Sequence, residues 1–176
     1  MDNIKKKIRT IPHFPKEGIM FRDITTLLQD AEGLQDVTKA LVERYKDADI
    51  DIVVGIEARG FILGGILAKE LKVGFVPIRK KGKLPYQTES VTYDLEYGQD
   101  TIEIHIDAIV KSQNVLLVDD LLATGGTSLA AANLIEKLGG NIVECTFIVD
   151  LPEVGGRKKL LDAGYKVFTL VEFEGE

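Results

Sequence analysis

The chain has 176 residues, of which 45% are hydrophobic and 28% charged, and its formal net charge is −6 at pH 7. A chain of this length and composition can bury a sizeable core, and we expect a single domain over residues 1–176. The negative charge argues against a general nucleic-acid-binding surface, and no apolar run approaches membrane-spanning length. A single cysteine, Cys145, and the lack of a recognisable signal peptide predict a cytoplasmic protein.

Hydrophobic periodicity predicts helices and strands that alternate through the middle of the chain. Near the start, the sequence predicts a short amphipathic helix within 1–9, an extended link over 11–15 and a loop or edge segment over 18–25. The pattern then predicts helices over 31–45, 60–71 and 129–138, and strands over 50–56, 73–78, 115–118, 142–149 and 166–171. This order favours an α/β fold with a central, mostly parallel sheet and helices on both faces.

Residues 86–107 depart from this order, because polar and apolar side chains alternate on either side of a turn at 97–100. The alternation predicts an exposed β-hairpin with strands over 90–94 and 101–106. Such a hairpin is long enough to act as a lid over a site. Between the last two strands we expect a loop over 152–157.

The most specific chemical signal lies between Val115 and Ser128. Asp119 and Asp120 follow a buried apolar run, and an Ala-Thr-Gly-Gly-Thr segment then leads into a helix. Glycine N–H groups can turn inward on an anion, and a helix N-terminus adds free N–H groups and a positive dipole end. The carboxylates would repel phosphate but can accept hydrogen bonds from vicinal hydroxyls. The segment therefore fits ribose 5-phosphate, and the simpler alternative is a strand-end turn followed by a helix N-cap.

A second signal is a basic cluster, formed by Arg79, Lys80 and Lys83 within the segment 79–85. It comes directly after an expected strand, where open α/β sheets place ligand groups. The cluster is therefore either an anion site or a charged turn in solvent.

Five motifs occur together and in order. The stretch 119–127 resembles the phosphoribosyl-pyrophosphate (PRPP) motif of type I phosphoribosyltransferases. Four other segments accompany it: Pro15–Thr25, Glu57-Ala-Arg-Gly-Phe61, Ile78–Pro85 and Leu95-Glu-Tyr-Gly98. With the Phe-Arg-Asp-Ile and Leu-Glu-Tyr-Gly pieces, the chain resembles the adenine phosphoribosyltransferase family over about residues 5–174.

The resemblance implies a glycosyltransferase (pentosyltransferase) of purine salvage that converts adenine and PRPP to AMP and pyrophosphate. It implies Mg²⁺, held mainly by PRPP near Asp119 and Asp120 and without a certain protein ligand. It also implies a homodimer, an N-terminal hood over the base within residues 1–35, and a flexible lid hairpin over 80–106. Small-molecule substrates are the expected partners, with no nucleic acid and no membrane.

The resemblance also assigns roles to single residues. The 5′-phosphate would be held by Ala123, Thr124, Gly125, Gly126 and Thr127, and the ribose hydroxyls by Asp119 and Asp120. Pyrophosphate would be held by a loop with a cis peptide and by the basic cluster, namely Glu57, Ala58, Arg59, Arg79, Lys80 and Lys83. The main chain of Met20 and Arg22 would read adenine, with the ring held between Phe21 and Leu121. Glu96 would be the acid/base, and Tyr97 would exclude water.

Two other functions stay open. The first is a phosphoribosyltransferase for another purine base, but a 6-oxopurine often needs a lysine donor, and none stands beside Asp119 and Asp120. The second is a non-catalytic PRPP-binding regulator. Such a protein would be expected to carry a DNA-binding module or a basic face, for which 176 residues and a charge of −6 leave no room.

Overall fold

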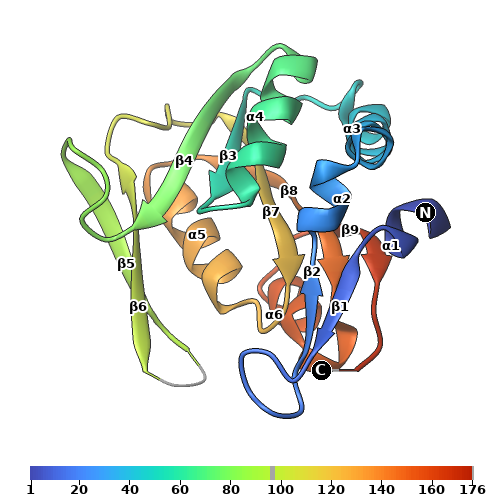
Figure 1. Cartoon of the computed structure of the whole chain (residues 1–176). Helices are drawn as coiled ribbons and strands as arrows, with labels where there is room; N and C mark the ends of the chain where they lie inside the picture. The colour runs from blue at the N-terminus through green and yellow to red at the C-terminus, as the bar shows by residue number, and fades with distance from the viewer. Residues whose placement is uncertain (96–97, 176) are drawn as a thin grey trace.

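The computed structural model describes residues 1–95 and 98–175, and at its centre is a seven-stranded sheet (Figure 1). The strand order is β5-β6-β4-β3-β7-β8-β9. The strands are β3 (Ile52–Ile56), β4 (Gly74–Lys80), β5 (Thr88–Asp94), β6 (Gln99–His105), β7 (Asn114–Leu122), β8 (Asn141–Asp150) and β9 (Val167–Glu172). In this order, the five strands β4, β3, β7, β8 and β9 are parallel to one another. β6 is antiparallel to both of its neighbours, β4 and β5. The predicted fold class is confirmed.

Helices cover both faces of this sheet. α3 (Ala31–Tyr45) and α4 (Gly60–Leu71) pack on one face, and α5 (Gly126–Lys137) and α6 (Gly156–Asp162) pack on the other (Figure 1). Successive strand residues point to opposite faces, so Val53 belongs to the core beneath α4 and Val54 to the core beneath α5. Because both faces are buried, the parallel strands are unbroken apolar runs in the sequence.

A close contact fixes α4 on the sheet. A Cβ atom on Gly64 would lie 2.6 Å from the ring of Phe75, so no side chain fits at this position. At the next position, Gly65 has nothing within 4 Å of its Cβ direction. Close packing of α4 on the sheet therefore requires glycine at position 64 but not at position 65. The start of α4 is also close to β7: a Cβ atom on Gly60, the first residue of the helix, would lie 2.9 Å from the carbonyl oxygen of Val118.

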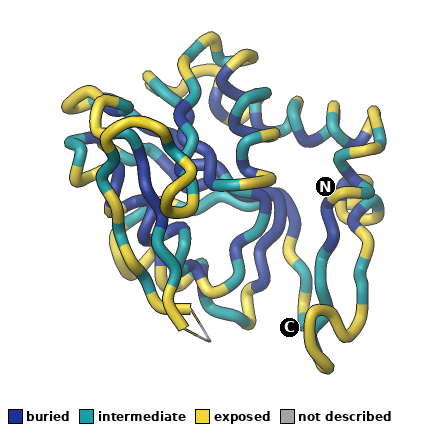
Figure 2. The backbone as a smooth tube through the Cα atoms, turned by 60° about the vertical axis from the view of Figure 1, so that its left-hand side comes forward, coloured by how far each residue is buried: buried dark blue, intermediate teal, exposed yellow. Residues whose placement is uncertain are grey.

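The N-terminal segment forms a separate two-stranded ribbon. α1 (Asp2–Lys6) leads into β1 (Arg9–Pro12), which pairs antiparallel with β2 (Met20–Asp23), and α2 (Thr25–Gln29) then leads to α3. The short helix and the edge strand are confirmed, whereas α2 was not predicted. The loop between β1 and β2, the end of β5 and the start of β6 lie at the end of the sheet toward which β7 points (Figure 1). All three are largely exposed in the described residues (Figure 2).

The β5–β6 hairpin is more integrated than its sequence suggests. β6 pairs with β4 through Arg79↔Glu103 and Lys80↔Ile102, and Ile102, Glu103 and Ile104 are buried. The expectation of an exposed hairpin is therefore wrong for β6. An alternating pattern shows that one side of a strand is apolar, but it does not show which neighbour covers that side.

A second difference concerns the segment between β8 and β9, where the sequence suggested a loop over 152–157. A 3₁₀ turn over Pro152–Val154 is followed by Gly155 at φ +86, and α6 begins at Gly156. The adjacent glycines look like loop residues in the sequence, although here they join two helical segments. Among the described residues, no helix is long and apolar enough to cross a membrane.

Candidate active site

The loop between β7 and α5 surrounds a small cavity. β7 runs through both aspartates and ends at Leu122, which is further than the apolar run predicts. Gly125, at φ +73, is the N-cap of α5 and adopts a conformation that other residues rarely adopt. The cavity has a volume of about 100 Å³ and is lined by residues 123–128 with Asp119 and Leu121. Its size and its position at a helix N-terminus fit one phosphate group.

A second cavity, of about 340 Å³, adjoins the first. Asp119, Leu121 and Thr127 line both cavities. The other residues that line the larger cavity are Ile56, Glu57, Ala58, Arg59, Ile78, Lys80, Tyr93, Leu95, Asp100, Ile102 and Asp120. The structure therefore brings most of the predicted ribose and pyrophosphate residues together beyond the carboxyl ends of β3, β4 and β7, where open α/β sheets bind ligands.

The two aspartates differ in their surroundings. The Arg59 Nε atom donates to Oδ2 of Asp120 at 2.5 Å, and Asp120 is 5% exposed. The backbone N–H of Asp120 donates to Oδ1 of Asp119 at 2.8 Å. Burial and the neighbouring Asp120 raise the pKa of Asp119 well above its ordinary value. Asp120 is therefore paired with a guanidinium, whereas burial disfavours the charged form of Asp119.

The predicted pyrophosphate loop follows β3. The peptide bond between Glu57 and Ala58 is cis, which confirms the feature that the resemblance implied. Glu57 accepts hydrogen bonds from Lys83, from the backbone N–H of Lys80 at 3.0 Å and from Arg79 at 3.3 Å. Lys80 lies 3.0 Å from Asp100 on β6. Of the basic cluster only Lys80 lines the cavity, and each of the three side chains has an acidic partner with which an anion would compete.

These contacts predict an acid-dependent loss of stability at Glu57. Burial alone would raise the pKa of Glu57, but Lys83, the Lys80 N–H and Arg79 outweigh it and lower the pKa from 4.5 to about 2. A lowered carboxyl pKa stabilises the fold above pH 4.5, and this contribution is lost as the pH falls toward about 2. We expect Glu57→Gln to cost about 1–2 kcal/mol at pH 7, after allowance for the exposed Lys83, and almost nothing near pH 2.

Urea unfolding of Glu57→Gln and wild type at several pH values measures this difference. Glu43→Gln is the matched control, because Glu43 is an exposed carboxylate that also accepts a hydrogen bond from a lysine, Lys46. The control should show a small difference at every pH. A Glu57→Gln cost that does not change with pH would contradict the expectation.

Sequence reasoning missed Tyr93, which lies on β5 and lines the larger cavity. The Thr127 hydroxyl donates to the Tyr93 hydroxyl at 3.0 Å, so the hairpin contacts the predicted phosphate loop directly. Burial raises the pKa of Tyr93 above its ordinary value. In the sequence Tyr93 is one member of an alternating strand, and no local signal distinguishes it. Glu96 and Tyr97, the predicted catalytic pair, lie outside the described residues.

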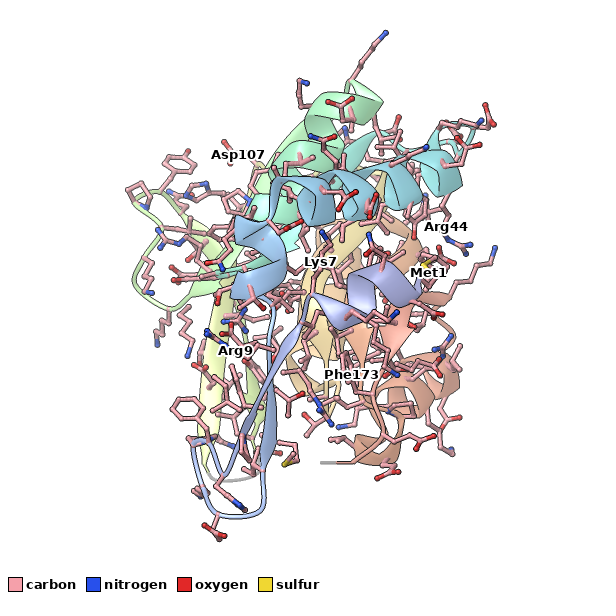
Figure 3. The ribbon with its side chains drawn as sticks, turned by 45° about the vertical axis from the view of Figure 1, so that its right-hand side comes forward. Met1, Lys7, Arg9, Arg44, Asp107 and Phe173 are labelled. Atoms are coloured by element: carbon pink, nitrogen blue, oxygen red, sulfur yellow. The ribbon has the colours of Figure 1, made fainter. Side chains whose placement is uncertain are left out.

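The predicted adenine residues are divided between two places. Leu121 lines both cavities, whereas Met20, Phe21 and Arg22 on β2 line neither of them in the described structure. The Arg22 side chain donates to Thr10 Oγ1 at 2.6 Å and to the carbonyl oxygen of Glu174 at 2.8 Å. Arg22 also stacks on Phe173, which lies below α1 and beside the β1–β2 ribbon (Figure 3). A role of β2 in reading the base through its main chain stays a prediction.

The donor atoms near the cavity limit how the protein could hold a metal. No group of three or more His, Cys, Asp or Glu side chains in residues 1–95 and 98–175 could hold a metal ion. Asp119 and Asp120 supply hard carboxylate oxygens to the larger cavity. Two carboxylates fit Mg²⁺ that keeps most of its ligands from water and substrate phosphates.

The fold is an α/β fold with two adjoining cavities at the carboxyl ends of its parallel strands, and the family comparison identifies the class of protein. The model of the phosphoribosyl transferase domain matches residues 23–174. The chain therefore belongs to the phosphoribosyl transferase family.

Similar individual proteins show which members of the family this chain resembles. The adenine phosphoribosyltransferase of Nitrosospira multiformis is 62% identical over 172 residues, which cover 98% of both chains. The crystal structure of adenine phosphoribosyltransferase from Thermoanaerobacter pseudethanolicus has a TM-score of 0.93 at 48% identity and covers 98% of this chain and 99% of that chain. The Giardia lamblia enzyme, complexed with 9-deazaadenine, has a TM-score of 0.92 at 41% identity, with coverage of 98% and 97%. Within the family, the chain groups with the adenine phosphoribosyltransferases, which confirms the resemblance.

Proposed function

We propose that this chain is an adenine phosphoribosyltransferase of purine salvage, which transfers the phosphoribosyl group of PRPP to adenine and releases pyrophosphate. The observation that carries the proposal is the pair of adjoining cavities. A phosphate-sized cavity at the start of α5 shares Asp119, Leu121 and Thr127 with a larger one that contains the second aspartate, Arg59 and Lys80.

The reaction forms a bond between N9 of adenine and C1 of the ribose while the bond from C1 to the pyrophosphate oxygen breaks. Positive charge develops on the ribose ring and negative charge on the leaving group. Asp119 and Asp120 hold the ribose hydroxyls, and Arg59, Arg79, Lys80 and Lys83 stabilise the departing pyrophosphate. Holding both substrates in line contributes about 7–11 kcal/mol when the geometry is good.

The proposal also includes the acid/base, the lid, the metal ion and the hood. Glu96 accepts the ring proton that adenine loses, and Tyr97 helps to exclude water; both residues come between β5 and β6 in the sequence. Asp119 and Asp120 would lie close to Mg²⁺ held mainly by PRPP, and the ion would supply positive charge that offsets the charge of the pyrophosphate. The hood formed by β1 and β2 places the base against Leu121. A homodimer and a cytoplasmic location are part of the same proposal and rest on the resemblance.

A product assay tests the proposal. The purified protein is mixed with PRPP, Mg²⁺ and either adenine, hypoxanthine, guanine or xanthine, and the nucleotides are separated by chromatography. We expect AMP from adenine and at least 100-fold slower turnover of the 6-oxopurines, because polar groups arranged for the wrong edge would be left unpaired (a factor on the order of 10⁴ is attainable). IMP, GMP or XMP as the main product would assign another base, and binding of PRPP without any product would favour a regulator.

A further inference from the structure

We propose that Gly156 is a positioning residue for the phosphate-binding loop, so that the start of α6 fixes the geometry with which this loop holds the 5′-phosphate of PRPP. Gly156 lines neither cavity and comes from a segment well separated in sequence from the loop. The inference rests on the phosphate-binding role proposed above for residues 123–127.

The backbone of Gly156 lies directly behind the loop. The N–H of Gly156 donates to the carbonyl oxygen of Ala123 at 2.9 Å. A Cβ atom on Gly156 would lie 2.3 Å from this oxygen and 2.7 Å from the backbone nitrogen of Gly125. In the other direction, a Cβ on Gly125 would lie 2.9 Å from the Cα and from the carbonyl oxygen of Gly156. Two backbones are therefore in contact here, with no flexible side chain between them that could give way.

Steric contact, and not backbone conformation, is what requires glycine at this position. Gly156 is the first residue of α6 and does not have the positive φ of its neighbour Gly155. Alanine is therefore compatible with the backbone angles of Gly156, and its methyl group would meet only the atoms of the loop. Contacts between a Cβ and other heavy atoms are normally beyond 3.4 Å, so the loop or α6 must move by about 1 Å.

α6 is held firmly, which makes the loop the part that moves. One nitrogen of Arg157, Nη1, contacts Asp150 Oδ2 at 3.0 Å, Thr169 Oγ1 at 3.1 Å and Glu172 Oε1 at 2.9 Å. Asp150 is fully buried, and its strand β8 and the strand of the other two residues, β9, belong to the main sheet. Leu160 of α6 is also fully buried in the core beneath α5. The anchor lies next to Gly156 in sequence, so the sheet fixes the surface against which the loop rests.

A displaced loop should weaken the binding of PRPP much more than the binding of adenine. The nitrogen of Gly125 belongs to the loop that would donate N–H groups to the phosphate, and a 1 Å displacement of a binding group can cost a factor of about 100. The base would be held by the hood and by Leu121, which also lines the phosphate-sized cavity but precedes Ala123, the carbonyl of which Gly156 contacts, by two residues. We therefore expect Gly156→Ala to raise KM for PRPP about 10- to 100-fold while KM for adenine changes less than about twofold.

Steady-state kinetics on Gly156→Ala, with both substrates varied, provide the test. Gly65→Ala is the matched control: it also adds one methyl group to a helical glycine, but nothing lies within 4 Å of that methyl. The control should keep both KM values. Calorimetric titration with ribose 5-phosphate gives a second readout, in which Gly156→Ala should bind at least 10-fold more weakly than wild type. Unchanged PRPP and ribose 5-phosphate binding by a folded Gly156→Ala protein would overturn the proposal, as would equal increases of both KM values.

If Gly156→Ala does not fold, the variant Arg157→Gln tests the proposal instead. This variant weakens the anchor without adding volume behind the loop, and it should raise KM for PRPP about fivefold at constant KM for adenine. An unchanged KM for PRPP would overturn the proposal. The titration tests the role of Gly156 independently of the proposed activity. Wild-type protein that binds ribose 5-phosphate but makes no AMP would refute the enzyme assignment. The role of Gly156 would still be tested by comparing the ribose 5-phosphate affinities of wild type and variant.

Discussion

Asp120→Asn is expected to lose about 30- to 1,000-fold in kcat/KM for the transfer from PRPP to adenine. The carboxylate of Asp120 lines the larger cavity and is 5% exposed. It is expected to accept a hydrogen bond from a ribose hydroxyl, which would place its negative charge beside the ribose as the ring becomes positive in the transition state. Loss of a charged acceptor and of this electrostatic contribution corresponds to about 2–4 kcal/mol.

The fold should survive this substitution. Asparagine has nearly the same shape as aspartate, and the side chain of Arg59, which donates to Asp120, is 46% exposed and can be solvated by water. We therefore expect the thermal midpoint of Asp120→Asn to stay within a few degrees of wild type. The separation of a large kinetic effect from a small effect on stability is the result to look for.

Glu144→Gln is the matched control for this experiment, because Glu144 is also a nearly buried carboxylate paired with an arginine, Arg44. It lines neither cavity, so the control should keep full activity per folded molecule. A kcat/KM of Asp120→Asn within about threefold of wild type would show that Asp120 does not contact the reacting ribose, since even one charged hydrogen bond is worth about 1.5–3 kcal/mol.

The features that sequence reasoning predicted correctly are those whose cause is local. α3 and α4 begin and end where the apolar spacing indicates, at Ala31–Tyr45 and Gly60–Leu71. The phosphate-sized cavity forms where two glycines follow a buried strand, because a positive φ at Gly125 depends on that residue alone. In such cases, a few neighbouring residues determine the backbone.

The features that it did not predict depend on pairs that are distant in sequence. Arg59 and Asp120 are separated by 61 positions and Tyr93 and Thr127 by 34. A periodic pattern shows that a side chain faces a neighbour, but it does not show which neighbour or in which register. For the same reason the burial of β6 against β4, and the contact of Gly156 with the loop, follow only from the assembled sheet.

A third such pair predicts the largest effect on stability. Glu144→Ala is expected to lower the free energy of unfolding by about 2–4 kcal/mol. Glu144, on β8, accepts hydrogen bonds at 2.7 Å from Nε and Nη2 of Arg44 and from the hydroxyl of Tyr45. Arg44 also stacks on the ring of Phe168 of β9, 3.8 Å from its centroid. This network holds the end of α3 to two strands of the sheet, on the side of the molecule away from the tip of the β1–β2 ribbon (Figure 3).

The two partners of Glu144 should contribute unequally to this loss. The Arg44 side chain is 38% exposed, so water replaces part of what its guanidinium loses. The Tyr45 residue is 3% exposed, and its buried hydroxyl would lose the carboxylate to which it donates. Tyr45→Phe, which removes this hydroxyl and keeps the ring, should therefore be milder than Glu144→Ala, with a loss of about 1 kcal/mol.

Thermal and urea unfolding of both variants, with Glu43→Gln as the exposed control, measures these differences. For a chain of this size, 2–4 kcal/mol corresponds to a decrease of roughly 5–15 °C in Tm. Activity per folded molecule should not change, because the network is remote from both cavities. A Glu144→Ala protein as stable as wild type would mean that the pair contributes no more than a surface ion pair. The helix α3 would then be held by its apolar contacts, among them those of Val37 and Leu41.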